Sequence, residues 1–129
     1  MASQVWRKQP VDVTMPEVNV IWQGDATSQI LRALRHCTVP TSPLNVGGPS
    51  QTSIEALAQA FPARFGTEPI FTGRPSSTAW INDTSQATGL FGPPLVPLER
   101  MIDWTADWVS REMPGYAKPT RYEVRDGRF

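Results

Sequence analysis

Apolar and polar residues alternate in short runs along the first quarter of this chain. Residues 11–15 (VDVTM) follow a period of two, which predicts a strand, and residues 18–22 resume the pattern after Pro16. A helix is predicted next, because apolar residues recur every three to four positions: Ala26, Ile30, Ala33, Leu34 and Cys37. This order is typical of an α/β protein in which helices cover a mostly parallel sheet.

The middle of the chain predicts a strand, a turn and a second helix. Residues 44–46 read as a short strand that the Gly-Gly-Pro turn closes, and Thr52 and Glu55 have the spacing of a helix capping box. Pro62 is expected to kink or end this helix, and Gly66 is the expected terminator. The apolar stripe of the helix comprises Ile54, Leu57, Ala58, Phe61 and Phe65.

Two more helices are predicted in the last part of the chain. Residues 69–72 read as a strand and residues 78–82 as an extended piece, after which Asp83 is expected to cap a short helix that ends near Gly92. Pro97 suits the start of the final helix. One face of that helix carries Leu98, Met101, Ile102, Thr105, Trp108 and Val109. The polar tail favours turns, with an extended piece around residues 122–125.

Composition narrows the class of protein. The chain has 129 residues, 40% hydrophobic and 19% charged, which fits one domain, or a piece of one, spanning residues 1–129. Its 13 prolines favour turns over long helices. The formal net charge is zero and no basic run stands out. Neither nucleic acid nor an anionic membrane surface is therefore an expected partner.

The lone cysteine, Cys37, excludes an internal disulfide and favours a reducing compartment. His36 stands beside it, but adjacent helix positions do not face each other, and two such residues do not make a metal site. The amino-terminal segment has no apolar core long enough for a signal peptide, and no stretch approaches a membrane span. The chain is expected to be cytoplasmic.

Six segments carry a family resemblance through their order. They read NVIWQGDA, NVGGP, TSIEALAQAF, NDTSQATGLFGPP, LERMIDWTADWV and KPTRYEVRDGRF. This series resembles the C-terminal part of the NAD-dependent epimerase/dehydratase family, which belongs to the extended short-chain dehydrogenase/reductase superfamily. The resemblance implies an α/β fold that is the incomplete C-terminal part of an extended short-chain dehydrogenase, with short strands and three to four helices. Residues 1–129 would then form one substrate-domain-like fragment without the N-terminal Rossmann half.

The chemistry expected of a complete member of that family is absent from the sequence. No G-x-x-G-x-x-G turn occurs, and Pro49 removes an amide donor directly after Gly48. The family's Tyr-x-x-x-Lys pair is missing as well, because Thr120 and Asp126 stand four positions after the two tyrosines. The resemblance implies NAD(P) for a complete member, whereas no catalytic or cofactor-binding residue is predicted in this chain.

The segment NVIWQGDA departs from the family pattern in two ways. Many members that bind nucleoside-diphosphate sugars place an Arg just before this strand, and Val18 stands there instead. A sugar-nucleotide substrate is therefore not favoured. Trp22 and Gly24 also replace the family's His and first Asp.

Five residues are candidates for a substrate pocket: Asn19, Trp22, Gln23, Asp25 and Asn45. Trp22 and Gln23 follow a strand, where α/β folds often expose pocket residues, although a packed Trp fits equally well. Asp25 is favoured as a helix cap over a substrate contact. Asn45 is favoured as a turn residue that bonds to backbone.

Two classes of function follow. In the first, the chain is a C-terminal portion of an NAD(P)-dependent oxidoreductase, either a truncated gene product or half of a split protein, and it is not catalytic alone. Its partner would be a separate N-terminal cofactor domain. In the second, it is a stand-alone interaction module whose strand edges and apolar face favour association, including self-association. An inactive remnant is a third possibility, and enzymatic activity stays open.

Overall fold

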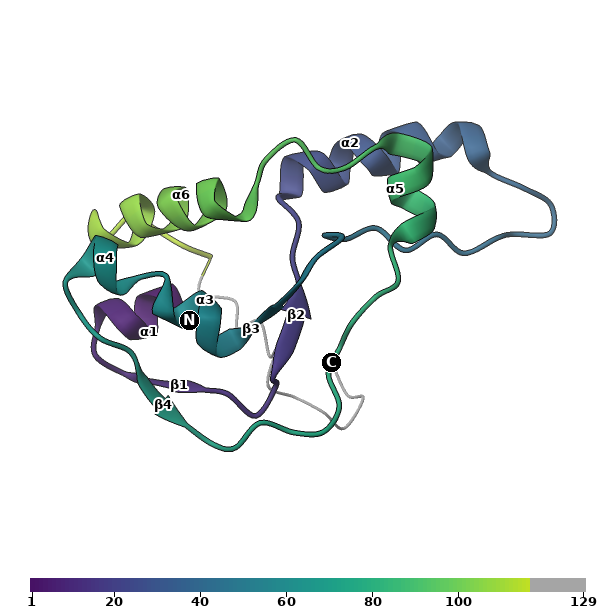
Figure 1. The fold of residues 1–129 in the computed structure, drawn as a ribbon. Coiled ribbons are helices and arrows are strands. Elements are labelled where there is room, and N and C mark those ends of the chain that lie inside the picture. Colours follow the sequence, from purple (N-terminus) through teal and green to yellow (C-terminus); the bar gives the residue numbers. More distant parts are fainter. Residues whose placement is uncertain (117–129) are drawn as a thin grey trace.

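The computed structural model describes residues 1–116, so the extension predicted around residues 122–125 lies outside the described residues. Helices and short strands alternate along the chain (Figure 1). In order they are α1 (Ala2–Trp6), β1 (Pro10–Asp12), β2 (Glu17–Asn19), α2 (Gln23–Ala33), the 3₁₀ turn η1 (Leu34–His36), β3 (Gln51–Ser53), α3 (Ile54–Gln59), α4 (Pro62–Phe65), β4 (Ile70–Thr72), α5 (Ser85–Phe91) and α6 (Leu98–Ser110). This mixed α/β content agrees with the predicted fold class.

The described strands form two separate ladders. β1 pairs in parallel with β4, with Val11 opposite Phe71, and β2 pairs antiparallel with β3, with Val18 opposite Thr52. A single parallel bridge also links Val18 to Trp80, within the segment predicted to be extended. The described part of the chain therefore contains one parallel and one antiparallel pair where a mostly parallel sheet was predicted.

The strand predicted at residues 44–46 is wrong for the isolated chain. These residues are extended but belong to no ladder within residues 1–116, and the strand that pairs with β2 is β3. A strand forms only when a neighbour satisfies its backbone groups, and the described chain offers none at this place. The apolar pattern of residues 44–46 therefore predicts a strand that finds no partner strand among residues 1–116.

The buried core lies where α1, β1, α3 and α6 meet, at one end of the molecule (Figure 1). Its most deeply buried members are Val5, Val11, Val13, Ile54 and Ala58. α1 was not predicted, because five residues are too few for a helix to be stable by propensity alone. Val5 is fully buried in this core, and tertiary packing of this kind is what stabilises so short a helix.

Pro62 divides the predicted middle helix in two, as expected. α3 ends at Gln59, and Pro62 occupies the first turn of α4, where its missing N–H costs no helical hydrogen bond. Gly66 ends α4 in the left-handed conformation with φ of 64°. The capping position was predicted one residue early: Ser53, not Thr52, accepts the hydrogen bond from the N–H of Ala56, at 2.9 Å.

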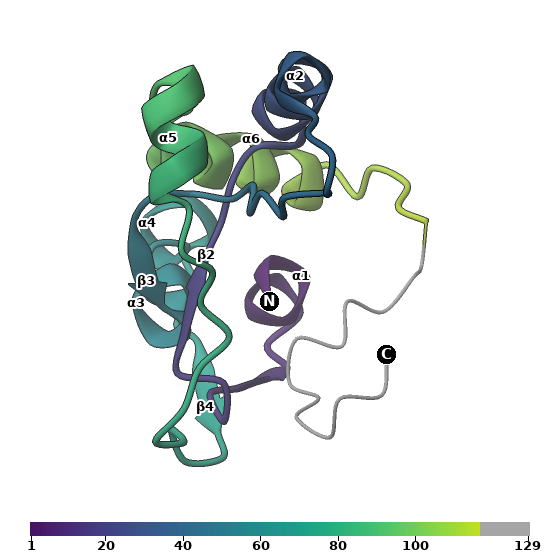
Figure 2. The same cartoon turned by 90° about the vertical axis from the view of Figure 1, so that its right-hand side faces the viewer.

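Helix α2 exposes its apolar side, which contradicts the predicted burial pattern. Ile30, Leu34 and Cys37 are exposed, while the polar residues Asp25 and Gln29 are buried. Figure 2 shows α2 and α5 side by side at the top of the molecule.

No helix within residues 1–116 is long and apolar enough to cross a membrane.

Candidate functional site

Asn19 lies at the end of β2 and joins three segments of the chain. Its Nδ2 donates to the carbonyl oxygen of Gly48 at 3.0 Å and to that of Asn82 at 2.9 Å. Its Oδ1 accepts from the N–H of Asn82 at 3.3 Å. Both ends of this side-chain amide are thus engaged by backbone. Asn19 therefore holds the borders of the site together.

Asn45 reaches the same loop from the other side. Its Nδ2 donates to the carbonyl oxygen of Asp83 at 3.1 Å, next to the carbonyl that Asn19 engages. The two asparagines, far apart in sequence, thus fix successive carbonyls of residues 82 and 83. A backbone-bonding role was the favoured prediction for Asn45, and the geometry agrees with it.

An open groove of about 770 Å³ lies at this junction. Asn19, Gln51, Asp83 and Thr88 are among the residues that line it, and among residues 1–116 no Lys or Arg does. A smaller hollow of about 370 Å³ borders Asn19 as well, together with Val18 and Trp80. The groove offers amide, hydroxyl and carboxylate groups, which suits a neutral hydroxylated ligand better than a phosphate.

The charge of the groove is set by Asp83. A hydrogen bond from the backbone N–H of Ser85, 3.0 Å from Oδ1, is the main cause that lowers the pKa of this carboxyl, and the Ser85 hydroxyl adds to it. Asp83 is therefore a carboxylate at neutral pH. It precedes α5 as predicted, although its hydrogen bond to Ser85 spans two residues and Thr84 occupies the cap position.

The other three predicted residues lie at the start of α2, away from this groove's lining. Trp22 is half-exposed and meets Trp104 of α6 edge to face, with ring centroids 5.8 Å apart. Gln23 is exposed. The prediction that Asp25 caps the helix is wrong: it lies in the first turn, and its Oδ2 accepts from the N–H of Val96 at 2.9 Å. The helix begins after Trp22, whose side chain provides no cap.

The Gly47-Gly48 turn does not fit a dinucleotide cradle. Both glycines are buried, and a Cβ on Gly48 would stand 1.9 Å from the carbonyl oxygen of Val20. The missing side chain thus allows a close approach of two backbone segments. In a phosphate cradle the same freedom would expose N–H groups to the ligand, and Pro49 has none to offer.

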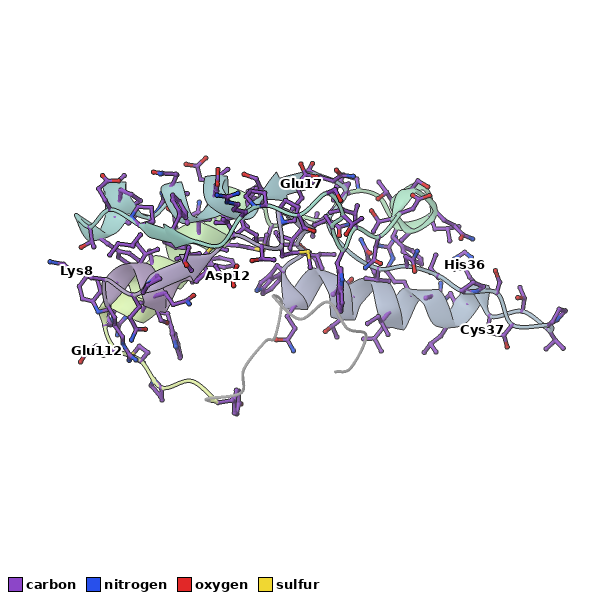
Figure 3. All side chains as sticks on the ribbon, turned by 90° about the horizontal axis from the view of Figure 1, so that it is seen from below. Lys8, Asp12, Glu17, His36, Cys37 and Glu112 are labelled. Carbon is purple, nitrogen blue, oxygen red and sulfur yellow. The ribbon has the colours of Figure 1, made fainter. Side chains whose placement is uncertain are left out.

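Acidic and basic side chains of the described residues form ion pairs on α6 and its neighbour α4: Arg64 with Glu99 and Asp103, and Arg111 with Asp107. His36 packs edge to face on Phe91, and the Cys37 Sγ lies 3.8 Å from the carbonyl oxygen of Ala33. Within residues 1–116 no three His, Cys, Asp or Glu side chains gather closely enough to hold a metal ion. Figure 3 shows His36 and Cys37 near the end of α2. The acidic residues predicted on the solvent side of α6, Asp103 and Asp107, are exposed.

Of the five residues predicted for a substrate pocket, the structure brings only Asn19 and Asn45 to this groove. Sequence reasoning missed Gln51, which lies at the groove because residues 51–53 form β3, a strand that was not predicted. It also missed Asn82 and Thr88, although Asp83, next to Asn82, was predicted as a helix cap. The signal that points to them is the pairing of two distant asparagines with consecutive carbonyls, and a single sequence does not reveal such a relationship.

Solved enzyme structures share this fold. UDP-glucuronic acid 4-epimerase from Bacillus cereus, in complex with NAD, matches with a TM-score of 0.64 at 18% identity, over 88% of this chain and 38% of its own. The Thermus thermophilus UDP-glucose 4-epimerase complex with NAD matches with a TM-score of 0.65 at 16% identity, over 84% of this chain and 38% of its own. UDP-glucose-4-epimerase from Stenotrophomonas maltophila, with bound NAD and formylated UDP-arabinopyranose, matches with a TM-score of 0.61 at 23% identity. That match covers 86% of this chain and 38% of the epimerase.

These likenesses establish the fold. The chain spans 38% of the length of each of these epimerases, so its fold is a portion of theirs, consistent with the predicted C-terminal portion. No family model matches the sequence. No curated protein matches it either. The fold predicted from the order of motifs is thus confirmed by structural likeness at low sequence identity.

Proposed function

We propose that this chain is the C-terminal, substrate-domain-like portion of an NAD(P)-dependent epimerase/dehydratase-type oxidoreductase, and that it does not turn over substrate alone. One observation carries the proposal: the fold likeness covers most of this chain and 38% of the epimerases. Completed by a cofactor-binding portion, the protein would transfer a hydride to or from a carbinol or keto group. Cytoplasmic placement, supported by the single Cys37, is part of the proposal.

The nicotinamide cofactor belongs to the other portion of the proposed enzyme. The neighbouring epimerase structures are complexes with NAD, but the buried Gly47-Gly48 turn of this chain offers no place for a pyrophosphate. The 129 residues also carry no Gly-rich fingerprint and no Tyr-x-x-x-Lys pair. We therefore assign to this chain the recognition of substrate and not the chemical step.

The groove at Asn19 is our candidate for that recognition. Asn19 and Asn45 shape its borders through backbone hydrogen bonds, while Gln51 and Thr88 are left to contact a ligand. Because Asp83 is a carboxylate and no Lys or Arg of the described residues lines the groove, a phosphate would meet repulsion from this part of the chain. The expected ligand is the neutral, hydroxyl-bearing part of a substrate.

A nicotinamide titration tests the proposal. NADH and NADPH fluorescence would be followed with the purified chain up to about 1 mM nucleotide, the upper end of common KM values, and turnover would be followed with a panel of alcohols and sugars. We expect no saturable binding and no turnover. Stoichiometric binding at micromolar concentration, or clear turnover, would overturn the proposal. A flanking reading frame with a Gly-rich turn and a Tyr-x-x-x-Lys pair would support it.

A second candidate function is a stand-alone interaction module. The exposed apolar side of α2, which includes Ile30 and continues into Leu34 of η1, favours it, because a surface of this kind is usually covered in the working protein. Light scattering after size exclusion separates the two candidates. A partner-independent homo-oligomer would favour the module, whereas a chain that waits for a cofactor-binding portion should not form a defined oligomer.

A further inference from the structure

Strand β4 has a partner on one side only. Within residues 1–116 it pairs in parallel with β1, and no other described strand adjoins it. Figures 1 and 2 show β4 at the lower margin of the molecule. Ile70 is 50% exposed and Phe71 36%, and Thr72 is exposed as well. An exposed edge of this kind is a template for pairing with a strand of another chain.

The hydrogen bonds of the ladder identify the backbone groups that face outward from β4. The N–H of Val13 donates to the carbonyl oxygen of Thr72 at 3.0 Å, so Thr72 turns its backbone groups toward β1. In a parallel ladder the next residue along the strand points its own groups to the other side. The N–H and C=O of Phe71 therefore face the open edge. Among residues 1–116 no segment bonds to them there.

Two opposite charges stand symmetrically about Phe71. Glu68 precedes it by three positions and Arg74 follows it by three. Both side chains are exposed, and neither forms an ion pair with another residue of the described chain. Gly73, with φ of 82°, ends the extended backbone between Thr72 and Arg74. The open edge thus has a negative charge before the strand and a positive charge after it.

We propose that β4 pairs antiparallel with β4 of a second copy of this chain, about a two-fold axis at Phe71. Each Phe71 N–H then donates to the carbonyl oxygen of the other Phe71, and the two rings lie opposite each other. Ile70 of each copy lies opposite Thr72 of the other. The long side chains of Glu68 and Arg74 meet across the pair at both ends. Two separate ladders of β1 and β4 become one sheet of four strands.

The edge is complementary to itself, which favours a second copy as its occupant. A two-fold axis places every group opposite its complement, as a symmetric interface requires. Parallel pairing would instead place Glu68 beside Glu68 and Arg74 beside Arg74, and like charges opposite each other destabilise a sheet. The formal net charge of zero adds no general repulsion between two copies.

The pair should be weak, because three residues form a small interface. Stable complexes bury about 1,200 Å² or more, so we expect a Kd of about 0.1 mM. The chain is then mostly monomeric at the concentration of about 10 µM that suits size exclusion. The comparison of the two candidate functions by light scattering is therefore unaffected, and the inference does not rest on either of them.

Sedimentation equilibrium of the full chain, from about 10 µM to about 1 mM, tests the inference. We expect a monomer–dimer equilibrium. Glu68→Arg and Arg74→Glu each place like charges at both ends of the pair and should raise the Kd about tenfold or more. The double variant Glu68→Arg/Arg74→Glu exchanges the charges and should restore the Kd to within about threefold of the original.

The matched control is Glu112→Arg, which makes the same change of charge at an exposed position after α6. It should leave the Kd unchanged. Circular dichroism of every variant verifies that each one is folded.

Hydrogen exchange locates the pairing. The amide of Phe71 should exchange about threefold or more slowly at 1 mM than at 10 µM, because its N–H gains an acceptor in the dimer. A chain that stays monomeric would overturn the inference. So would a dimer that Glu112→Arg weakens as much as Glu68→Arg, or one that the charge exchange fails to restore. Protection of Phe71 at every concentration would mean that another segment of the same chain covers the edge, and would overturn it too. Nicotinamide binding decides the proposed function separately.

Discussion

The carboxylate of Asp25 accepts a hydrogen bond from the backbone N–H of Val96 across 71 positions of sequence, at 2.9 Å. Asp25 belongs to the first turn of α2, and Val96 lies in the proline-rich turn before α6. This contact joins α2 to the turn that leads into α6, and the rings of Trp22, just before α2, and Trp104 of α6 also meet. A carboxylate in the first turn is favoured by the helix dipole as well.

Removing this carboxylate should loosen the joint between α2 and α6. Asp25→Ala leaves the N–H of Val96 without its partner, which should cost about 1–3 kcal/mol of unfolding free energy. Asp25→Asn keeps an acceptor and should cost less. Urea unfolding measures both. Asp107→Ala is the control, because its ion pair with Arg111 is exposed and should be worth about 0.5 kcal/mol or less. Equal costs for Asp25→Ala and Asp107→Ala would contradict this account.

The borders of the groove should respond unequally to the loss of their asparagines. Asn19→Ala removes three hydrogen bonds to backbone and should destabilise by about 2–4 kcal/mol, while Asn45→Ala removes one exposed bond and should cost about 1 kcal/mol. Thermal unfolding gives the ranking. Hydrogen exchange gives the location, because the N–H of Asn82 loses its acceptor only in Asn19→Ala. Unchanged exchange at Asn82 in that variant would be the contrary result.

Two glycines should respond to alanine with opposite signs. At Gly48 the added Cβ would lie 1.9 Å from a backbone oxygen, so the strand must move and the expected cost exceeds about 3 kcal/mol. Gly89 lies inside α5 with nothing within 4 Å of a built Cβ, so alanine there should stabilise by up to about 1 kcal/mol. Denaturation midpoints measure both. A tolerant Gly48→Ala would mean that β2 and the turn do not approach so closely.

Acid should remove the stabilisation that Asp12 provides. The Thr14 hydroxyl, and then the Thr14 N–H at 2.7 Å, lower the pKa of this carboxyl below its ordinary value of 3.8. A lowered pKa in the folded state stabilises the protein above that ordinary value, and the contribution is lost as the pH falls below it. The effect should be less than about 1 kcal/mol, since Asp12 is largely solvated. Asp12→Asn should lessen the loss of stability as the pH falls below 3.8, as urea midpoints measured at several pH values would show.

Local rules in the sequence predicted the helices of the described chain well, except α1. Pro62 and Gly66 act through backbone geometry alone, so their effects on α3 and α4 could be anticipated. The side of a helix that is buried depends on what lies beside it. The buried side of α2 faces Val96, whose N–H bonds to Asp25. The apolar spacing of Ile30 and Leu34 gave no sign that the polar side would be the buried one.

The candidate site was harder to predict because its geometry depends on pairs of residues remote in sequence. Asn19 and Asn45 were selected as pocket residues, but the contacts that position them come from residues 82 and 83. The strand predicted at residues 44–46 failed for the related reason that a strand needs a partner. Where a pattern and the isolated fold disagree in this way, the disagreement points to a missing neighbour.

The parallel ladder between β1 and β4 has a consequence for how this chain matures on the ribosome. β1 and α1 are made before β4, so β1 completes its ladder only after β4 has left the exit tunnel, and α1 packs against α6, which is made later still. Non-local closure of this kind is slow. The segment of α1 and β1, with Val5 and Val11 uncovered until then, is where we expect chaperones to bind during synthesis.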